Sequence, residues 1–297
     1  MPVPPEILKQ VKGIALRTRG VVDSLFSGEF RSVFRGQGME FAEVRAYELG
    51  DDFRSIDWNV SARLGAPYVK TFTEERELTL LLIVDQSAST RVGAPITKAA
   101  RSVEVAAVLA LAGAREQDRV GAILFSDRIE HVVPPAKGRR HALRLIRDVL
   151  AFASRRRGTN LLKAVHYASN VLTHRSVVVV LSDFLAEGWE KAVRELASRH
   201  QVIAITVDDP REDDPPAAGW VEMADAESGR RSLVNTGSAA VRQRWRAAAQ
   251  ARRARRADQL RGAGVEHIPL DLTTDYGLVL RRAFAKRLRR RTAARRR

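Results

Sequence analysis

From residue 78 onward, short apolar runs alternate with longer amphipathic segments, and this alternation limits the chain to few folds. The apolar runs are hydrophobic throughout, which is typical of strands covered on both faces of a sheet. Strands are predicted at 78–84, 120–125, 128–133, 176–181, 202–207 and 265–270, and helices at 97–115, 139–153, 160–173, 188–199, 238–261 and 276–290. The order predicts an α/β fold: a doubly wound, mostly parallel sheet with helices on both faces.

The remaining segments suggest three parts. Residues 5–26 have the apolar spacing of a helix, whereas 30–78 is rich in glycine, aromatic and charged residues, as in β-hairpins and loops. We therefore expect an N-terminal helix and extension over 1–77, and a sheet domain over 78–274. A hairpin insertion near 215–236 that turns at 227–229, and a C-terminal helix and basic tail over 275–297, complete the predicted organisation.

Composition excludes several classes of function. The chain has no cysteine, which excludes disulfides, zinc–thiolate sites and thiol catalysis. Its six histidines are scattered, and none is paired in sequence with a plausible nucleophile, so we expect no enzyme. No apolar run approaches the roughly 18–20 residues of a membrane span, and the N-terminus lacks the apolar region of a signal peptide, so we expect a cytoplasmic protein.

The net charge of +16 is concentrated near the C-terminus. Residues 239–262 hold eight arginines and one aspartate, and residues 281–297 hold ten basic residues and no acidic one. Two interpretations stay open: a charged helix face exposed to solvent, or an electrostatic contact with nucleic acid or an anionic membrane.

Oxygen-bearing side chains follow three predicted elements. The segment 85–89 (Asp-Gln-Ser-Ala-Ser) follows the first buried strand, Gly158-Thr159-Asn160 precedes a helix, and Asp183 follows the third buried strand. In such a sheet, ligands bind just beyond the carboxyl ends of the strands. Two carboxylates and three hydroxyls suit Mg²⁺ or Mn²⁺, so the predicted metal ligands are Asp85, Ser87, Ser89, Thr159 and Asp183. The alternative is that the two serines only cap the following helix.

This order of motifs resembles the metal-ion-dependent adhesion site of von Willebrand factor A domains, and all five residues match its positions. The resemblance covers about residues 78–270. It implies a von Willebrand A-like fold in which a carboxylate from a partner protein completes the metal shell, so that the site recognises a protein and catalyses no reaction.

A second resemblance lies in the segment GQGMEFAEVRAYELGDDFRSIDW, residues 36–58. It is similar to the signature of the bacterial family called domain of unknown function 58, and this sequence resembles the family's short soluble type. The resemblance implies an adaptor or co-chaperone of a MoxR-type AAA+ ATPase. By their chemistry, the charged residues of 43–63 either form ion pairs that brace the segment around Trp58 or present a docking surface for a partner.

The predicted function is therefore a non-enzymatic, Mg²⁺-dependent protein–protein interaction module. The alternative, from another class, is a nucleic-acid- or anionic-membrane-associated protein that acts through its Arg-rich C-terminus. A metal-dependent hydrolase is less favoured, because no general base is evident near the oxygen cluster.

Overall fold

The computed structural model describes residues 5–26, 39–74, 78–91, 96–152, 154 and 158–295. The chain forms two compact units: Arg35–Leu78, and Met1–Phe34 together with Thr79–Arg297. Residues 36–38 of the segment that resembles the family signature, residues 75–77 before the first predicted strand, and residues 296–297 of the basic tail lie outside the described residues.

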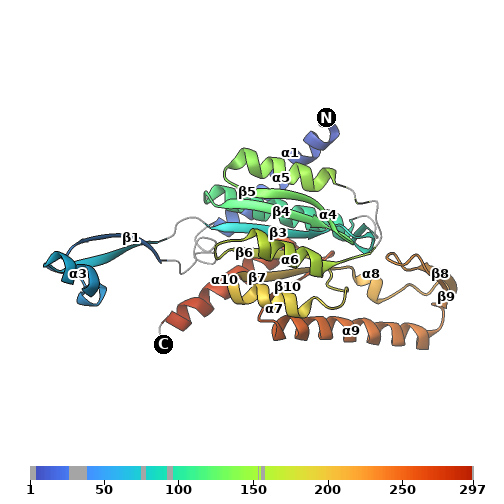
Figure 1. The fold of residues 1–297 in the computed structure, drawn as a ribbon. Helices are drawn as coiled ribbons and strands as arrows, with labels where there is room; N and C mark the ends of the chain where they lie inside the picture. The colour runs from blue at the N-terminus through green and yellow to red at the C-terminus, as the bar shows by residue number, and fades with distance from the viewer. Residues whose placement is uncertain are drawn as a thin grey trace. The chain divides into compact units, whose positions relative to one another are not determined.

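A six-stranded sheet forms the centre of the larger unit (Figure 1). Its strands are β3 (Thr79–Asp85), β4 (Arg119–Phe125), β5 (Ile129–Ala136), β6 (Val177–Leu181), β7 (Gln201–Asp208) and β10 (Glu266–Asp271). They lie in the order β10-β7-β6-β3-β4-β5, and every neighbouring pair is parallel except β4 and β5. The predicted doubly wound, mostly parallel sheet is confirmed.

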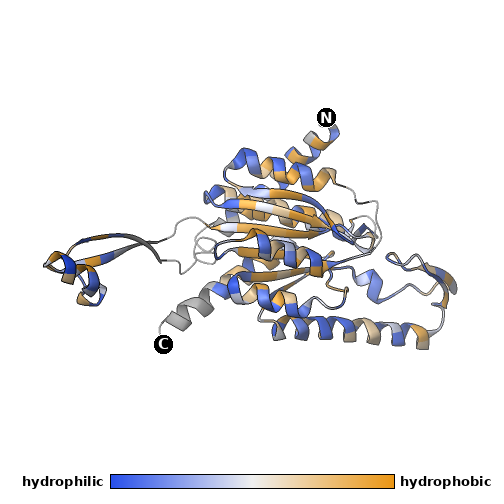
Figure 2. Cartoon of the chain, in the orientation of Figure 1, coloured by the Kyte–Doolittle hydropathy of each residue, from blue (hydrophilic) through white to orange (hydrophobic). Residues whose placement is uncertain are grey.

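Helices cover both faces of this sheet. On one face, α6 (Leu161–Val171) and α7 (Glu190–Arg199) share a buried cluster with the strand side chains of Leu81, Ile83 and Ile123. The other face carries a group that packs together: α1 (Pro5–Phe26), α4 (Lys98–Arg115), α5 (Arg139–Ala151) and α10 (Tyr276–Arg295). Figure 2 shows the apolar strands between these layers, and the mainly hydrophilic α9 (Ala239–Gly262).

The two terminal helices belong to the sheet unit, which differs from the expected parts 1–77 and 275–297. Val11, Ile14 and Val22 of α1 are buried, and α1 packs on α4. In α10, Leu280 and Phe284 are buried, so the first half of this helix is part of the core. Both helices carry an apolar stripe that must be buried against a neighbour, and this places them in the sheet unit. The overall composition of the two segments does not reveal these stripes.

The smaller unit is a two-stranded β-hairpin whose strands are connected by a long segment with two short helices. Strands β1 (Met39–Ala46) and β2 (Tyr68–Glu74) pair antiparallel, and η1 (Phe53–Ser55) and α3 (Trp58–Leu64) lie between them in sequence. Arg45 binds both carboxylate oxygens of Asp51, at 2.8 and 2.7 Å, which agrees with the ion-pair interpretation. Trp58, however, is 70% exposed, so the expectation that the ion pairs surround this ring is wrong.

Shorter elements follow the strand ends of the larger unit. They are η2 (Ala88–Arg91), α8 (Pro210–Asp213) and the predicted hairpin insertion, β8 (Trp220–Ala224) paired with β9 (Arg231–Asn235). Within the described part of the chain, no helix combines the length and the apolar character that crossing a membrane requires.

Candidate metal centre

The strand order places the topological switch point of the sheet at the carboxyl ends of β3 and β6. The chain runs from β3 to its neighbour β4, and later returns to β6 on the other side of β3. Loops that leave such a pair of strands diverge, and this switch point is where open α/β sheets bind ligands. Asp85 is the last residue of β3, and Asp183 follows the end of β6 by two residues.

Asp85 is a buried carboxylate held by hydrogen bonds from both sides. Its Oδ1 accepts the backbone N–H of Ser87 at 2.9 Å, and its Oδ2 accepts the hydroxyl of Ser182 at 2.6 Å. Burial, and next the negative charge of Asp183, raise the pKa of Asp85 to about 7. The ionised carboxylate is therefore costly in this place, and a cation beside it would offset that cost.

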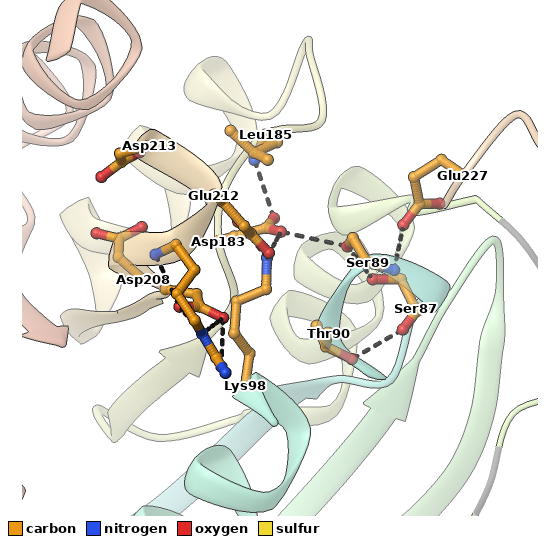
Figure 3. Close-up of polar contacts among 12 residues, drawn as sticks. Ser87, Ser89, Thr90, Lys98, Asp183, Leu185, Asp208, Glu212, Asp213 and Glu227 are labelled. Carbon is orange, nitrogen blue, oxygen red and sulfur yellow. Dashed lines mark hydrogen bonds and ion pairs between the residues drawn. The ribbon is translucent and has the colours of Figure 1, made fainter. Parts of the chain in front are cut away.

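The two serines connect Asp85 to Asp183. Ser87 Oγ lies 3.1 Å from Ser89 Oγ, and Ser89 donates its hydroxyl to Asp183 Oδ2 at 3.2 Å (Figure 3). The alternative that these serines cap the helix predicted over 97–115 is wrong, because Thr97 is the N-cap of α4 and its side chain accepts the backbone N–H of Ala100 at 3.1 Å.

Thr159 lies in the loop that leads into α6. The neighbouring Asn160 caps that helix and donates its backbone N–H to the carbonyl of Ser126 at 2.6 Å, which ties the loop to the end of β4. Among the described residues, no hydrogen bond joins the Thr159 hydroxyl to the other four predicted ligands. The structure thus links four predicted ligands directly, and the role of Thr159 stays a prediction.

A lysine that sequence reasoning missed faces the site. Lys98 begins α4, and its buried ammonium lies 3.6 Å from Asp183 Oδ2 and 2.9 Å from Glu212 Oε1. Burial lowers the pKa of Lys98, but the charges of Asp183 and Glu212 together outweigh it, so the pKa is raised and the side chain keeps its charge. No local sequence pattern connects this lysine to the 85–89 segment. The position of the first residue of α4 in the folded chain brings its side chain to Asp183.

An arginine of the basic helix also supports the site. Arg256 of α9 donates to the carbonyl of Asp183 at 2.9 Å and binds both carboxylate oxygens of Asp208, at 3.0 and 2.6 Å. It is buried, together with Ala249 and Leu260 of the same helix. Arg256 and Leu260 follow Ala249 by seven and eleven residues, which places all three on one face of the helix. This spacing is a sequence signal of a buried stripe in the arginine-rich helix.

The hairpin insertion contributes one further carboxylate. Glu227 Oε1 accepts the backbone N–H of Ser89 at 3.1 Å, and Figure 3 shows the side chain directed at the Ser87–Ser89 loop. The sequence identifies 227 as a turn position, but the distance of 138 residues from Ser89 gives no indication of the contact.

The donor chemistry fits a hard divalent cation. The connected oxygens come from carboxylates and hydroxyls, which Mg²⁺ and Mn²⁺ prefer. Over the described ranges, no three His, Cys, Asp or Glu side chains are grouped as a metal site by themselves. A cation here therefore depends on the serine hydroxyls as well as on Asp85 and Asp183.

Comparisons with known proteins find relatives in sequence and similar solved structures. The chain is 31% identical over 291 residues to the uncharacterised proteins Mb1516 of Mycobacterium bovis and Rv1480 of Mycobacterium tuberculosis, covering 96% of this chain and 91% of theirs. Among solved structures it is similar to BatB from Bacteroides thetaiotaomicron (TM-score 0.45, 14% identity, 71% of this chain and 99% of that one). It is also similar to the SpRpn10 VWA domain (TM-score 0.39, 11% identity, 70% and 94%).

The model of the family described as "protein of unknown function DUF58" matches residues 43–255, a range that begins within β1 and includes all the connected oxygen donors and most of α9. By this match and by its mycobacterial relatives, the chain belongs to the DUF58 family.

Proposed function

We propose that this protein is a non-enzymatic interaction module that binds a partner protein through a Mg²⁺ or Mn²⁺ ion. The observation that carries the proposal is the chain of contacts from Asp85 through Ser87 and Ser89 to Asp183 at the switch point of the sheet. Asp85, Ser87, Ser89 and Asp183 would hold the ion, with Thr159 as the fifth ligand.

The chemistry of these ligands favours an acidic partner. Three of the five are neutral hydroxyls, so a bound divalent cation retains attraction for an added carboxylate. The chain's own residues orient the site: Ser182 and the Ser87 N–H fix Asp85, and the Leu185 N–H holds Asp183 Oδ1 at 3.2 Å. A Glu or Asp of the partner would take the remaining position.

For the partner we propose a MoxR-type AAA+ ATPase, for which this protein would act as an adaptor or co-chaperone. Support for this part comes from the family resemblance of the 36–58 segment, not from the geometry of the site. A client protein that supplies a carboxylate is compatible with the same site.

The alternative, nucleic-acid or membrane binding through the basic C-terminus, receives less support. Several α9 arginines pair with the acidic segment 208–214: Arg246 with Asp214 at 2.8 Å, Arg253 with Asp213, and Arg256 with Asp208 at 2.6 Å. These ion pairs engage three of the eight α9 arginines within the fold, and Arg256 among them is buried.

The test is a capture experiment from native cell lysate, with and without nuclease, and with Mg²⁺ or with EDTA. Wild type is compared with Asp85→Ala, and with Asp271→Ala as a matched control, because Asp271 ends the edge strand β10 of the same sheet. We expect wild type and Asp271→Ala to recover a protein partner only with Mg²⁺. Asp85→Ala should recover at least about ten-fold less of that partner, because a charged metal ligand is lost; a ten-fold loss of affinity corresponds to about 1.4 kcal/mol.

Capture that survives EDTA, or that is unchanged in Asp85→Ala, would contradict the proposal. Recovery that disappears with nuclease, whatever the metal, would instead support the alternative.

A further inference from the structure

The β8–β9 hairpin holds one glutamate outward in a fixed turn. Within the turn, Asp225 N–H donates to the carbonyl of Arg230, and Gly229 N–H donates to the carbonyl of Asp225, both at 2.8 Å. Asp225 Oδ1 also accepts the backbone N–H of Ser228 at 2.6 Å. These bonds leave the side chain of Glu227 free to reach another element, which is the Ser87–Ser89 loop.

Only one oxygen of that carboxylate has a donor. Glu227 Oε1 accepts the Ser89 N–H at 3.1 Å, whereas Oε2 is buried and has no hydrogen-bond partner in the described part of the chain. A buried polar atom left unsatisfied costs about 1–3 kcal/mol, and such an atom needs an explanation.

The unpaired oxygen lies between two of the predicted ligand loops. A Cβ atom added to Gly158 would lie 4.0 Å from Glu227 Oε2, and Gly158 directly precedes Thr159. The same carboxylate is bonded to Ser89 on its other side. Glu227 thus contacts the loop that carries Ser89 and lies beside the loop that carries Thr159.

We propose that Glu227 is an internal carboxylate ligand of this metal site, with Oε2 in the position that an acidic side chain of a partner would occupy. This inference rests on the proposed function. The hairpin then caps the loaded site, and a partner must displace Glu227 to bind.

The consequence for affinity is quantitative. A carboxylate tethered by a short turn acts at an effective concentration of the order of millimolar. If the hairpin occupies the site in about nine molecules of ten, the apparent affinity for an external carboxylate falls about ten-fold. Displacement of the hairpin therefore sets a threshold that selects partners with further contacts.

The experiment measures Mn²⁺ binding to the full chain and amide hydrogen exchange with and without Mg²⁺. Glu227→Gln keeps an acceptor for the Ser89 N–H but removes the charge. The matched control is Glu222→Gln, in β8 of the same hairpin, where Glu222 is exposed and lies 3.5 Å from Arg231. Asp85→Ala reports on the metal site itself.

We expect Glu227→Gln to weaken Mn²⁺ binding about ten-fold, and Glu222→Gln to leave it unchanged. Mg²⁺ should slow exchange of the amides of 225–230 in wild type and in Glu222→Gln, but not in Glu227→Gln, because only a ligating Glu227 connects the turn to the ion.

Two results overturn the inference, and they differ. Equal Mn²⁺ affinity in Glu227→Gln and wild type, with binding abolished in Asp85→Ala, leaves the metal site standing and makes Glu227 a simple hydrogen-bond acceptor. Mn²⁺ binding that is absent from wild type or unchanged in Asp85→Ala removes the metal site and the internal ligand together.

Discussion

Lys98 sets the charge balance of the candidate metal site. Its ammonium lies 3.6 Å from Asp183 Oδ2, close enough to offset part of the charge that a metal ion would use. The same ammonium is paired with Glu212, and the lysine side chain is almost completely buried. Two cations, one covalently attached and one bound, would therefore share the carboxylate of Asp183.

Lys98→Met tests this sharing. Removing one partner of a buried ion pair leaves an uncompensated charge, so we expect the metal-free variant to lose about 3 kcal/mol or more of unfolding free energy. Mg²⁺ should bind the variant several-fold more tightly and raise its Tm by more than that of wild type. The measurement is thermal unfolding with a Mg²⁺ titration.

The control is Lys191→Met, an exposed lysine in the first turn of α7, for which we expect stability and Mg²⁺ response like those of wild type. Equal Mg²⁺ shifts in Lys98→Met and wild type would show that Lys98 does not act on the metal site.

At the scale of elements, β4 packs so closely against the edge strand β5 that one position of β4 has room only for glycine. The sequence predicts a strand over 128–133, yet β5 continues through Pro134 and Pro135 to Ala136. An edge strand tolerates prolines, because one row of its backbone groups needs no ladder partner. The register shifts between Val120 and Ala122, at Gly121.

Gly121→Ala tests that contact. A Cβ at this position would lie 2.9 Å from the carbonyl oxygen of Val133 and from the backbone nitrogen of Pro135, and backbone atoms cannot move away cheaply. We expect a loss of about 1–3 kcal/mol in unfolding free energy, measured by urea denaturation.

Gly20→Ala is the matched control, because Gly20 lies inside α1 with no atom within 4 Å of an added Cβ. Alanine should stabilise this helix by about 0.5–1 kcal/mol. Two variants with the same sign would contradict the packing argument.

At the scale of the whole molecule, the net charge of +16 has two components with different roles. Three of the α9 arginines, Arg246, Arg253 and Arg256, form ion pairs with the acidic segment 208–214, and Arg287 of α10 pairs with Glu266. The arginines of 288–297, in contrast, come in a run without any acidic residue.

Deleting 288–297 tests whether the positive charge of the C-terminal tail contributes to partner binding. The deletion removes six arginines and no acidic residue, so the chain should leave a heparin column at lower salt, as expected when fewer positive charges release counterions. Mg²⁺-dependent partner capture should stay the same. Capture that is lost on deletion would favour the alternative function.

The sequence by itself predicts most of the fold. Continuous apolar strands at 78–84 and 176–181, separated by amphipathic helices, suffice for a doubly wound sheet, because burial on both faces demands that pattern. The same logic places Asp85 and Asp183 at one edge, since parallel strands bring their carboxyl ends together. Short-range motifs also predict the turn at 227–229.

Only the tertiary structure decides what surrounds those carboxylates. Lys98, Glu227 and Arg256 come from three separate elements and carry no local pattern that points to the site. Helix amphipathicity and turn chemistry depend on neighbours within a few residues, whereas a charge contact depends on where long connections return in space. The sequence therefore determines the sheet and its ligand edge, and the folded chain determines the charges that control what binds there.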